Sequence, residues 1–252
     1  MSDVRTVLIT GASSGLGAEM ARQMAAAGLD LALAARRVTR LEELKAEILA
    51  AHPGRRVEVA ALDVNDHEAV FSVTADLAER LGGLDRVVVN AGLGKGAPLG
   101  TGRFDANLET AMTNFVGALA QTEAAMAHFR ERGRGHLVMV SSMSAKRGLP
   151  KATTTYAATK VAVAHLVEGL RTEFHAQPAF RFTVLYPGYI ISEMNDYAEP
   201  PNKLMSRTAD GVRSMVAAID AEVDDACVPR WPWSVLSPVM THAPTGIFKK
   251  LI

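Results

Sequence analysis

An apolar run, Val4–Thr10, leads directly into the glycine-rich sequence Thr10-Gly11-Ala12-Ser13-Ser14-Gly15-Leu16-Gly17. The next residues, Gly15–Ala27, carry apolar side chains at helical spacing, so we expect a strand, a tight loop and a helix in succession. In such a unit the three glycines permit a turn, a close approach of the backbone to a pyrophosphate, and tight helix–strand packing. The helix N-terminus offers N–H groups to the anion. The pattern predicts a dinucleotide-binding loop; a glycine-rich turn without a ligand is the alternative.

Short apolar segments alternate with helical ones along the rest of the chain. The expected strands are Val4–Thr10, Asp30–Ala35, Arg56–Leu62, Asp85–Asn90, Gly135–Ser141, Phe180–Tyr186 and, weakly, Ala226–Val228. Repeated alternation of this kind predicts an α/β, Rossmann-type fold, a doubly wound parallel sheet of about seven strands with helices on both faces. Because no linker or repeat interrupts the pattern, we expect residues 1–252 to form a single NAD(P)-binding domain.

Helix boundaries and the last quarter of the chain give further expectations. Thr39 with Glu42, and Asn65 with Glu68, have the spacing of capping boxes at helix starts. We expect a substrate lid near residues 189–206, followed by a helix over Thr208–Ala221. Residues 229–252 form an apolar C-terminal extension, in which four prolines prevent one long helix.

Composition excludes several classes of protein. Lys plus Arg and Asp plus Glu both total 27, so the chain has no net charge with which to hold nucleic acid. Its one cysteine, Cys227, and its seven scattered histidines give no metal-ligand cluster, and we expect no metal. No apolar stretch approaches the ~18 residues of a membrane span. We expect a cytoplasmic protein.

The type of dinucleotide is indicated at the end of the second expected strand. An acidic residue there would bind the ribose 2′-hydroxyl of NAD, whereas arginine accommodates the 2′-phosphate of NADP. The sequence has Arg36 and Arg37 and no carboxylate at this place. The forked guanidinium matches phosphate oxygens, which favours NADP(H) over NAD(H). The alternative is that both arginines are merely solvated.

A second motif has chemistry of its own. Tyr156 and Lys160 stand four residues apart at the start of a helical segment, so they share a helix face. A tyrosine with an ordinary pKa of about 10 is a poor acid or base at neutral pH, and a nearby ammonium would lower that pKa. Taken alone, such a pair is common by chance.

Several motifs together resemble the short-chain dehydrogenase/reductase family in their order and approximate spacing. They cover the chain from Val4 to about Met194 and are the glycine loop, Asp63-Val64, Asn90-Ala91-Gly92, Asn114, Ser141-Ser142, Tyr156 with Lys160, and Pro187-Gly188. The resemblance implies an oxidoreductase that transfers hydride between a nicotinamide and a carbonyl or alcohol.

The resemblance also implies roles for these residues. Tyr156 would be the general acid or base, Lys160 would lower its pKa and bind the nicotinamide ribose, Ser142 would bind the substrate oxygen, and Asn114 would hold a water of a proton relay. The remaining cofactor contacts that it implies are Asp63, Val64, Asn90, Ala91, Gly92, Pro187, Gly188, Ile190 and Ser192.

One interval departs from the family pattern. Ser142 lies one residue farther from Tyr156 than is usual, so Ser141 and Ser144 are rival candidates. The serine pair at the end of the fifth expected strand fits the pattern better, which favours Ser142.

The substrate and the partners are less well defined. The expected pocket includes Met143, the loop Leu93–Pro98 and the lid, whose apolar residues suggest a hydrophobic ketone, steroid or acyl derivative. The resemblance implies a homodimer or homotetramer. The apolar tail suits either peripheral membrane contact or docking over the cleft or a neighbouring subunit. A non-catalytic dinucleotide-binding sensor or scaffold is the alternative function, and an epimerase or dehydratase is a third.

Overall fold

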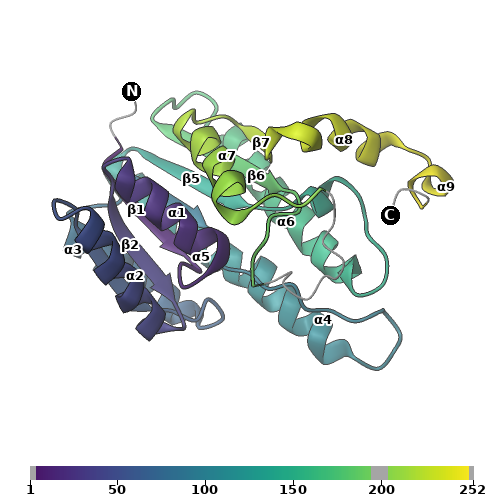
Figure 1. Cartoon of the computed structure of the whole chain (residues 1–252), viewed down its shortest axis with the longest axis horizontal. Coiled ribbons are helices and arrows are strands. Elements are labelled where there is room, and N and C mark those ends of the chain that lie inside the picture. Colours follow the sequence, from purple (N-terminus) through teal and green to yellow (C-terminus); the bar gives the residue numbers. More distant parts are fainter. Residues whose placement is uncertain (1–3, 194–203, 250–252) are drawn as a thin grey trace.

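The computed structural model describes residues 4–193 and 204–249 (Figure 1). One parallel sheet has its strands in the order β3-β2-β1-β4-β5-β6-β7. The strands are β1 Thr6–Thr10, β2 Asp30–Ala35, β3 Val57–Ala61, β4 Arg86–Val89, β5 Gly135–Val140, β6 Phe180–Pro187 and β7 Asp225–Val228. The predicted parallel sheet of about seven strands is confirmed, including the weakly indicated last strand.

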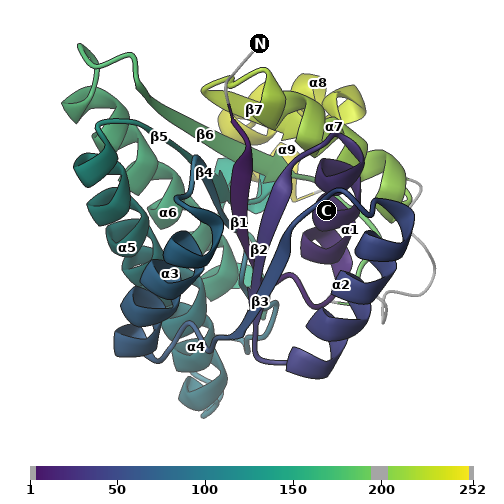
Figure 2. The ribbon, with the colours of Figure 1, turned by 90° about the vertical axis from the view of Figure 1, so that its left-hand side faces the viewer.

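Helices cover both faces of this sheet (Figure 2). Those on one face are α1 Gly15–Ala26, α2 Val38–Ala51 and α7 Thr208–Asp220, and those on the other are α3 His67–Leu81, α5 Gly117–Arg132 and α6 Thr153–Glu173. The shorter elements are α4 Phe104–Ala111, a π-helical turn η1 Met112–Val116, a 3-10 turn η2 Met143–Lys146, α8 Arg230–His242 and α9 Thr245–Phe248.

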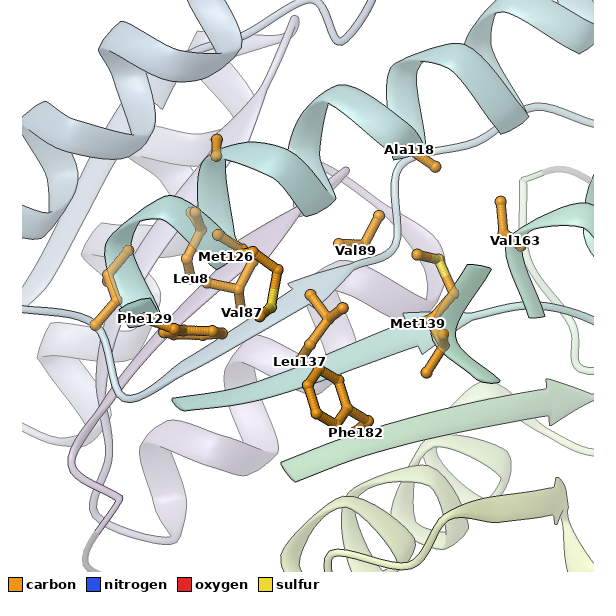
Figure 3. Close-up of a cluster of buried hydrophobic side chains, with 14 of the residues drawn as sticks. Leu8, Val87, Val89, Ala118, Met126, Phe129, Leu137, Met139, Val163 and Phe182 are labelled. Carbon is orange, nitrogen blue, oxygen red and sulfur yellow. The ribbon is translucent and has the colours of Figure 1, made fainter. Parts of the chain in front are cut away.

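Two hydrophobic clusters hold the layers together, one on each face. Successive strand residues point to opposite faces, so Leu8 and Val87 pack with Phe129 of α5 in one cluster (Figure 3). Ile9 and Val88, one position further along, pack in the other cluster with α1 and α7. Burial on both faces explains why the strand sequences are almost continuously apolar.

Both predicted capping boxes are wrong. Helix α2 begins at Val38, so Thr39 lies inside it, and its N-cap residue Arg37 makes no side-chain cap. Helix α3 is capped by Asp66, whose carboxylate accepts a hydrogen bond from Ala69 N at 3.0 Å. A carboxylate is a good cap and also favours the positive end of the helix dipole. The side chain of Asn65 instead donates to Thr113 Oγ1, at 3.1 Å.

The C-terminal segment forms two short helices, as its prolines predict. It is only partly exposed: Trp233 and Phe248 are buried, whereas Trp231, Val235 and Ile247 face solvent. Arg147, after η2, fixes the segment by donating to Thr241 O and Thr245 Oγ1, at 3.3 and 3.1 Å. Within the described ranges, none of the helices combines the length and hydrophobicity needed to cross a bilayer.

Candidate active site

The candidate site lies at the carboxyl ends of the central strands. The order of the strands reverses at β1, which pairs with β2 on one side and β4 on the other. A crevice at such a switch point is where open parallel sheets bind ligands. The predicted residues converge here because the glycine loop follows β1, Asn90 follows β4, Ser142 follows β5 and Gly188 follows β6.

The glycine loop has no room for side chains at two positions. Gly11 has φ +64°, and a Cβ there would stand 2.9 Å from the Cα of Ala91. A Cβ on Gly17 would stand 2.4 Å from the carbonyl oxygen of Gly11. The side chain of Ser14, the N-cap of α1, makes no capping hydrogen bond, and Ala18 N is bonded to Ser14 O. The first-turn N–H groups of α1, from Gly15, Leu16 and Gly17, are thus placed as a helix N-terminus places them for a phosphate.

Thr10 and Asn90 fix this loop against β4. Thr10 Oγ1 accepts hydrogen bonds from the N–H groups of Asn90 and Ala91, at 3.1 and 3.2 Å, and donates to Val88 O at 3.3 Å. Asn90 Nδ2 in turn donates to Thr10 O at 2.9 Å. The sequence analysis gave Thr10 no role. A polar residue that ends an apolar strand was the available signal.

The two arginines after β2 differ in their surroundings. Arg37 reaches the glycine loop, where its Nε and Nη2 donate to the hydroxyls of Ser13 and Ser14 at 3.2 and 2.5 Å. Arg36 has a 70% exposed side chain that lies 4.0 Å from the carboxylate of Asp63. Arg37 also forms an ion pair with Glu193, at 3.0 Å, which the sequence analysis did not foresee because the two residues are 156 positions apart.

Tyr156 and Lys160 lie in the first turns of α6, with Ser142 facing them from the end of β5. The side chain of Ser142 interacts with the Tyr156 phenol and acts to lower its pKa. The Lys160 ammonium lies 5.6 Å from the centre of the Tyr156 ring and donates to Val140 O at 2.9 Å. The three polar side chains therefore form one cluster, as their order in the sequence predicts.

Burial controls the protonation of this cluster. It raises the pKa of Tyr156, and the side chain of Ser142 opposes that shift only in part. It lowers the pKa of Lys160 from 10.5 to about 8, because the charged form loses its water. The Tyr156 pKa is therefore shifted in the direction opposite to the one that the resemblance implies, because burial dominates.

The structure separates the three candidate serines. Ser141 is buried, and its hydroxyl donates to the Lys160 carbonyl at 2.7 Å, so it supports the helix instead of the site. Ser142 Oγ accepts from Ser144 N at 3.1 Å and also meets Tyr156. Ser144 Oγ is buried and has no hydrogen-bond partner among the described residues. Only Ser142 of these three contacts the tyrosine phenol.

Asn114 lies in the π-helical turn η1 between α4 and α5. Its Oδ1 accepts from Leu93 N at 2.8 Å, and its Nδ2 donates to Leu93 O at 2.9 Å. A Cβ on Gly92 would stand 3.1 Å from Asn114 Oδ1 and 3.6 Å from Lys160 Nζ. Asn114, Gly92 and Lys160 are therefore neighbours, and the amide of Asn114 holds the loop after β4. Single π-turns of this kind are frequent at functional sites.

The remaining predicted residues are placed around the same crevice. Val64 is buried against Gly117, and Asp63 Oδ1 accepts from Asn65 N at 3.0 Å. Ile190 is buried against Gly211, and Ser192 approaches the glycine loop, where a Cβ on Gly15 would stand 3.4 Å from Ser192 Cβ.

Trp233 is a neighbour of the site that the sequence analysis assigned only to the apolar tail. A Cβ on Gly188 would stand 2.0 Å from its indole ring, and Tyr189 makes an edge contact with it at 5.6 Å between ring centres. Helix α8 therefore packs behind the end of β6. Residues 194–203, the larger part of the expected lid, lie outside the described residues. Among the residues that the structure places, no group of histidine, cysteine or acidic side chains could hold a metal.

Comparisons with known proteins agree with this arrangement. Residues 5–203 match the short chain dehydrogenase family. An uncharacterized oxidoreductase of Mycobacterium tuberculosis is 51% identical over 244 residues, which cover 97% of this chain and 96% of that protein. The dehydrogenase/reductase SDR family member 11 of Homo sapiens is 35% identical over 74% of this chain and 73% of its own.

Solved structures show the same fold. The alcohol dehydrogenase of the archaeon Thermococcus sibiricus, complexed with 5-hydroxy-NADP, has a TM-score of 0.79 and 29% identity, covering 88% of this chain and 95% of its own. Levodione reductase has a TM-score of 0.82 and 26% identity, covering 91% and 98%. With the family match over most of its length, this chain belongs to the short-chain dehydrogenase/reductase family of oxidoreductases.

Proposed function

We propose that the protein is an NADP(H)-dependent oxidoreductase that interconverts a carbonyl and a secondary alcohol on a mainly hydrophobic substrate. The observation that carries this proposal is the cluster of Tyr156, Ser142 and Lys160 at the carboxyl ends of the central strands, where Ser142 interacts with the Tyr156 phenol and the Lys160 ammonium lies 5.6 Å from the centre of its ring. Two hydroxyls that meet at one point can both bind a carbonyl oxygen where negative charge develops.

The nicotinamide cofactor, when bound, supplies or accepts the hydride. In the reductive direction Tyr156 gives its phenolic proton to the substrate oxygen, and Ser142 donates a hydrogen bond to the same oxygen. A phenol whose pKa is raised by burial stays protonated until negative charge develops on the substrate oxygen. The amine of Lys160, with a pKa of about 8, is able to hold or release a proton beside the tyrosine near neutral pH.

We assign Asn114 a role in positioning the loop after β4. Both polar atoms of its side chain are used by Leu93, so a relay water would have to share them. The lack of space for a Cβ at Gly11 and Gly17 reflects the tight packing of the loop on Ala91 and on the start of α1, which is the packing that a dinucleotide-binding loop requires. The other proposed cofactor contacts are the expected ones around the crevice, namely Ser13, Ser14, Gly15, Leu16, Asp63, Val64, Asn90, Ala91, Gly92, Pro187, Gly188, Ile190 and Ser192.

The preference for NADP(H) rests on Arg37. Its contact with the hydroxyls of Ser13 and Ser14 puts a guanidinium at the mouth of the glycine loop, and Arg36 is exposed beside it. An alcohol dehydrogenase and a serine dehydrogenase of the same fold, 29% and 26% identical, are described in complex with 5-hydroxy-NADP and with NADP+. These two complexes support the same phosphate-bearing cofactor here.

The substrate pocket needs one change from the expectation. Met143 is 3% exposed and packs in the core cluster, so it supports the pocket from behind. We propose that the loop after β4 and the residues near Tyr189 and Met205 form the wall of the pocket. Their apolar side chains favour a hydrophobic substrate. No nucleic acid is expected as a partner, and the cytoplasm remains the proposed compartment.

Assembly as a homodimer or homotetramer is proposed from the family. Leu99, before α4, and Phe104 and Leu108, within it, are large apolar side chains that are exposed. Trp233 and Phe248 of the tail are buried against the protein itself, so they are not available for contact with a membrane, and this argues against membrane contact by the tail. Equal co-sedimentation with vesicles for the whole chain and a variant without residues 234–252 would exclude that contact.

The cofactor proposal is tested by fluorescence titration with NADPH and NADH in parallel. We expect tighter binding of NADPH, and loss of that preference when Arg36 and Arg37 are both replaced by alanine. Equal or tighter binding of NADH by the unaltered chain would contradict it.

A non-catalytic sensor or scaffold of the same fold is the second candidate. Such a protein needs the glycine loop but has no use for a buried lysine beside a tyrosine–serine pair, which favours the enzyme. Turnover distinguishes the two.

A further inference from the structure

The carboxylate of Glu193 lies in a site built for an anion. It accepts a hydrogen bond from Arg37 Nη1 at 3.0 Å and forms a second ion pair with Arg40, and the side chain of Ser14 helps to lower its pKa. These partners come from two parts of the chain, which are the glycine loop and the start of α2, where Arg37 is the N-cap residue and Arg40 lies in the first turn.

One of these partners, Arg37, is also the residue to which the proposed function assigns the 2′-phosphate of the cofactor. Arg37 contacts Ser13 and Ser14 directly, so the guanidinium that holds Glu193 is also the one next to the glycine loop. A surface cavity of about 500 Å³ opens here, lined in part by Ser14, Arg40, Glu43 and Glu193. The cavity lies between the start of α1, helix α2 and the Glu193 carboxylate.

We propose that Glu193 is a specificity-determining residue, because its carboxylate occupies the anion site that the 2′-phosphate of NADP(H) would use. This inference rests on the proposed function, in which Arg37 binds that phosphate. To bind there, the phosphate must displace the carboxylate from Arg37 and Arg40, since two anions cannot share the same donors without repulsion. NAD(H), which has a hydroxyl at this position, leaves Glu193 in place. Glu193 thus makes the ratio of NADPH affinity to NADH affinity smaller than Arg37 and Arg40 would make it without this carboxylate.

The competition is present throughout the working pH range. The side chains of Arg40 and Ser14 lower the pKa of Glu193 to about 2. The carboxylate is therefore ionised at any pH at which the protein is assayed. Its ion pairs are half exposed, so the competition is modest and weakens with salt.

The direct test compares dissociation constants of NADPH and NADH for the unaltered protein and Glu193→Gln. We expect NADPH to bind about three- to tenfold more tightly to the variant, as loss of two exposed ion pairs implies, while NADH affinity changes little. Glu43→Gln is the matched control. It removes one negative charge from the same cavity, but Glu43 forms none of the hydrogen bonds or ion pairs just described for Glu193. An equal gain from both variants would mean a general effect of charge and would overturn the proposal.

Two fragments keep the failure of this inference distinct from the failure of the proposed function. Adenosine 2′,5′-bisphosphate carries the phosphate in question, and adenosine 5′-monophosphate lacks it. If Arg37→Ala leaves the affinity for the bisphosphate unchanged, the NADP(H) proposal itself fails.

If Arg37→Ala weakens the bisphosphate selectively but Glu193→Gln leaves the NADPH:NADH affinity ratio unchanged, only the role of Glu193 is overturned. Weaker binding of both cofactors to Glu193→Gln would overturn it too. In that case Glu193 would close over the cofactor and not compete with it.

Discussion

Two serines two positions apart have different fates in the site, and this difference allows a test at the scale of single residues. Ser142 meets the Tyr156 phenol, whereas the hydroxyl of Ser144 is buried and has no hydrogen-bond partner among the described residues. We predict that Ser142→Ala lowers kcat by about 100-fold or more, the effect of removing one donor to a developing oxyanion.

Ser144→Ala is the matched control for this substitution. It should leave kcat nearly unchanged, because its hydroxyl does not contact the tyrosine. Steady-state kinetics of both variants tests this assignment. A larger loss of kcat in Ser144→Ala than in Ser142→Ala would mean that Ser144, and not Ser142, binds the substrate oxygen.

Lys160 gives a prediction for stability because its pKa is lowered to about 8 by burial. The unfolded chain then holds this proton up to the ordinary lysine pKa of ~10.4, while the folded chain releases it earlier. Below pH 8 the buried ammonium of Lys160 destabilises the folded state by the full amount. This destabilisation disappears as the pH rises toward 10.4, because folding then no longer has to bury a charge. The unfolding free energy of the natural protein, measured against that of Lys160→Met, should therefore rise over this interval by on the order of 3 kcal/mol.

Denaturant unfolding of both proteins at pH 7 and pH 10 measures that difference. An unchanged difference between the two pH values would mean that the ammonium is not buried as described.

At the scale of elements, helix α8 supports the site from behind β6. The indole of Trp233 fills the space where Gly188 would carry a side chain. Gly188→Ala should therefore destabilise the fold by about 1–3 kcal/mol, as overpacking does, and should lower turnover because the strand end must shift.

Gly169 in α6 is the comparison for this element. A Cβ there meets nothing within 4 Å, so Gly169→Ala should stabilise by about 0.5–1 kcal/mol, as expected for alanine in a helix. Thermal unfolding should give a lower Tm for Gly188→Ala and a higher Tm for Gly169→Ala than for the natural protein. The same change of Tm in both variants would contradict the packing of Trp233 on Gly188.

At the scale of the whole molecule, the end of the sheet opposite the site is held by a buried polar network. Arg86 of β4 is fully buried; its Nε donates to His136 Nδ1 on β5 at 2.9 Å, and its Nη1 pairs with Asp220 of α7 at 2.9 Å. Burial, followed by the charge of Arg86, lowers the pKa of His136 to about 3, so the imidazole is neutral and can accept.

We predict that Arg86→Ala destabilises the protein by about 3 kcal/mol in a single transition, because a buried network loses its centre. The exposed Arg130, which pairs with Glu173, is the control, and Arg130→Ala should change stability little. Calorimetry measures both. Two separate transitions would contradict the expectation that the chain is one domain.

The sequence predicted those features that depend on local pattern. Strand–helix alternation is enough to identify the sheet, and the glycine loop, Tyr156 and Lys160 are recognisable by their spacing. What it missed depends on contacts between distant residues. The ion pair of Arg37 with Glu193, the packing of Trp233 on Gly188 and the hydrogen bond of Ser141 to the Lys160 carbonyl have no local signature. The helix starts failed for a different reason: α2 begins one residue before Thr39, and Asp66, next to Asn65, caps α3.

The proposed function requires that Tyr156 moves a proton during hydride transfer. The measurement that tests it most directly is the rate of NADPH oxidation with a panel of hydrophobic ketones, for the natural protein and for Tyr156→Phe, together with the NADPH affinity of each. We predict turnover that falls by at least about 100-fold in the variant, the usual scale of general acid catalysis, while NADPH affinity stays the same. Undiminished turnover in Tyr156→Phe would contradict the claim.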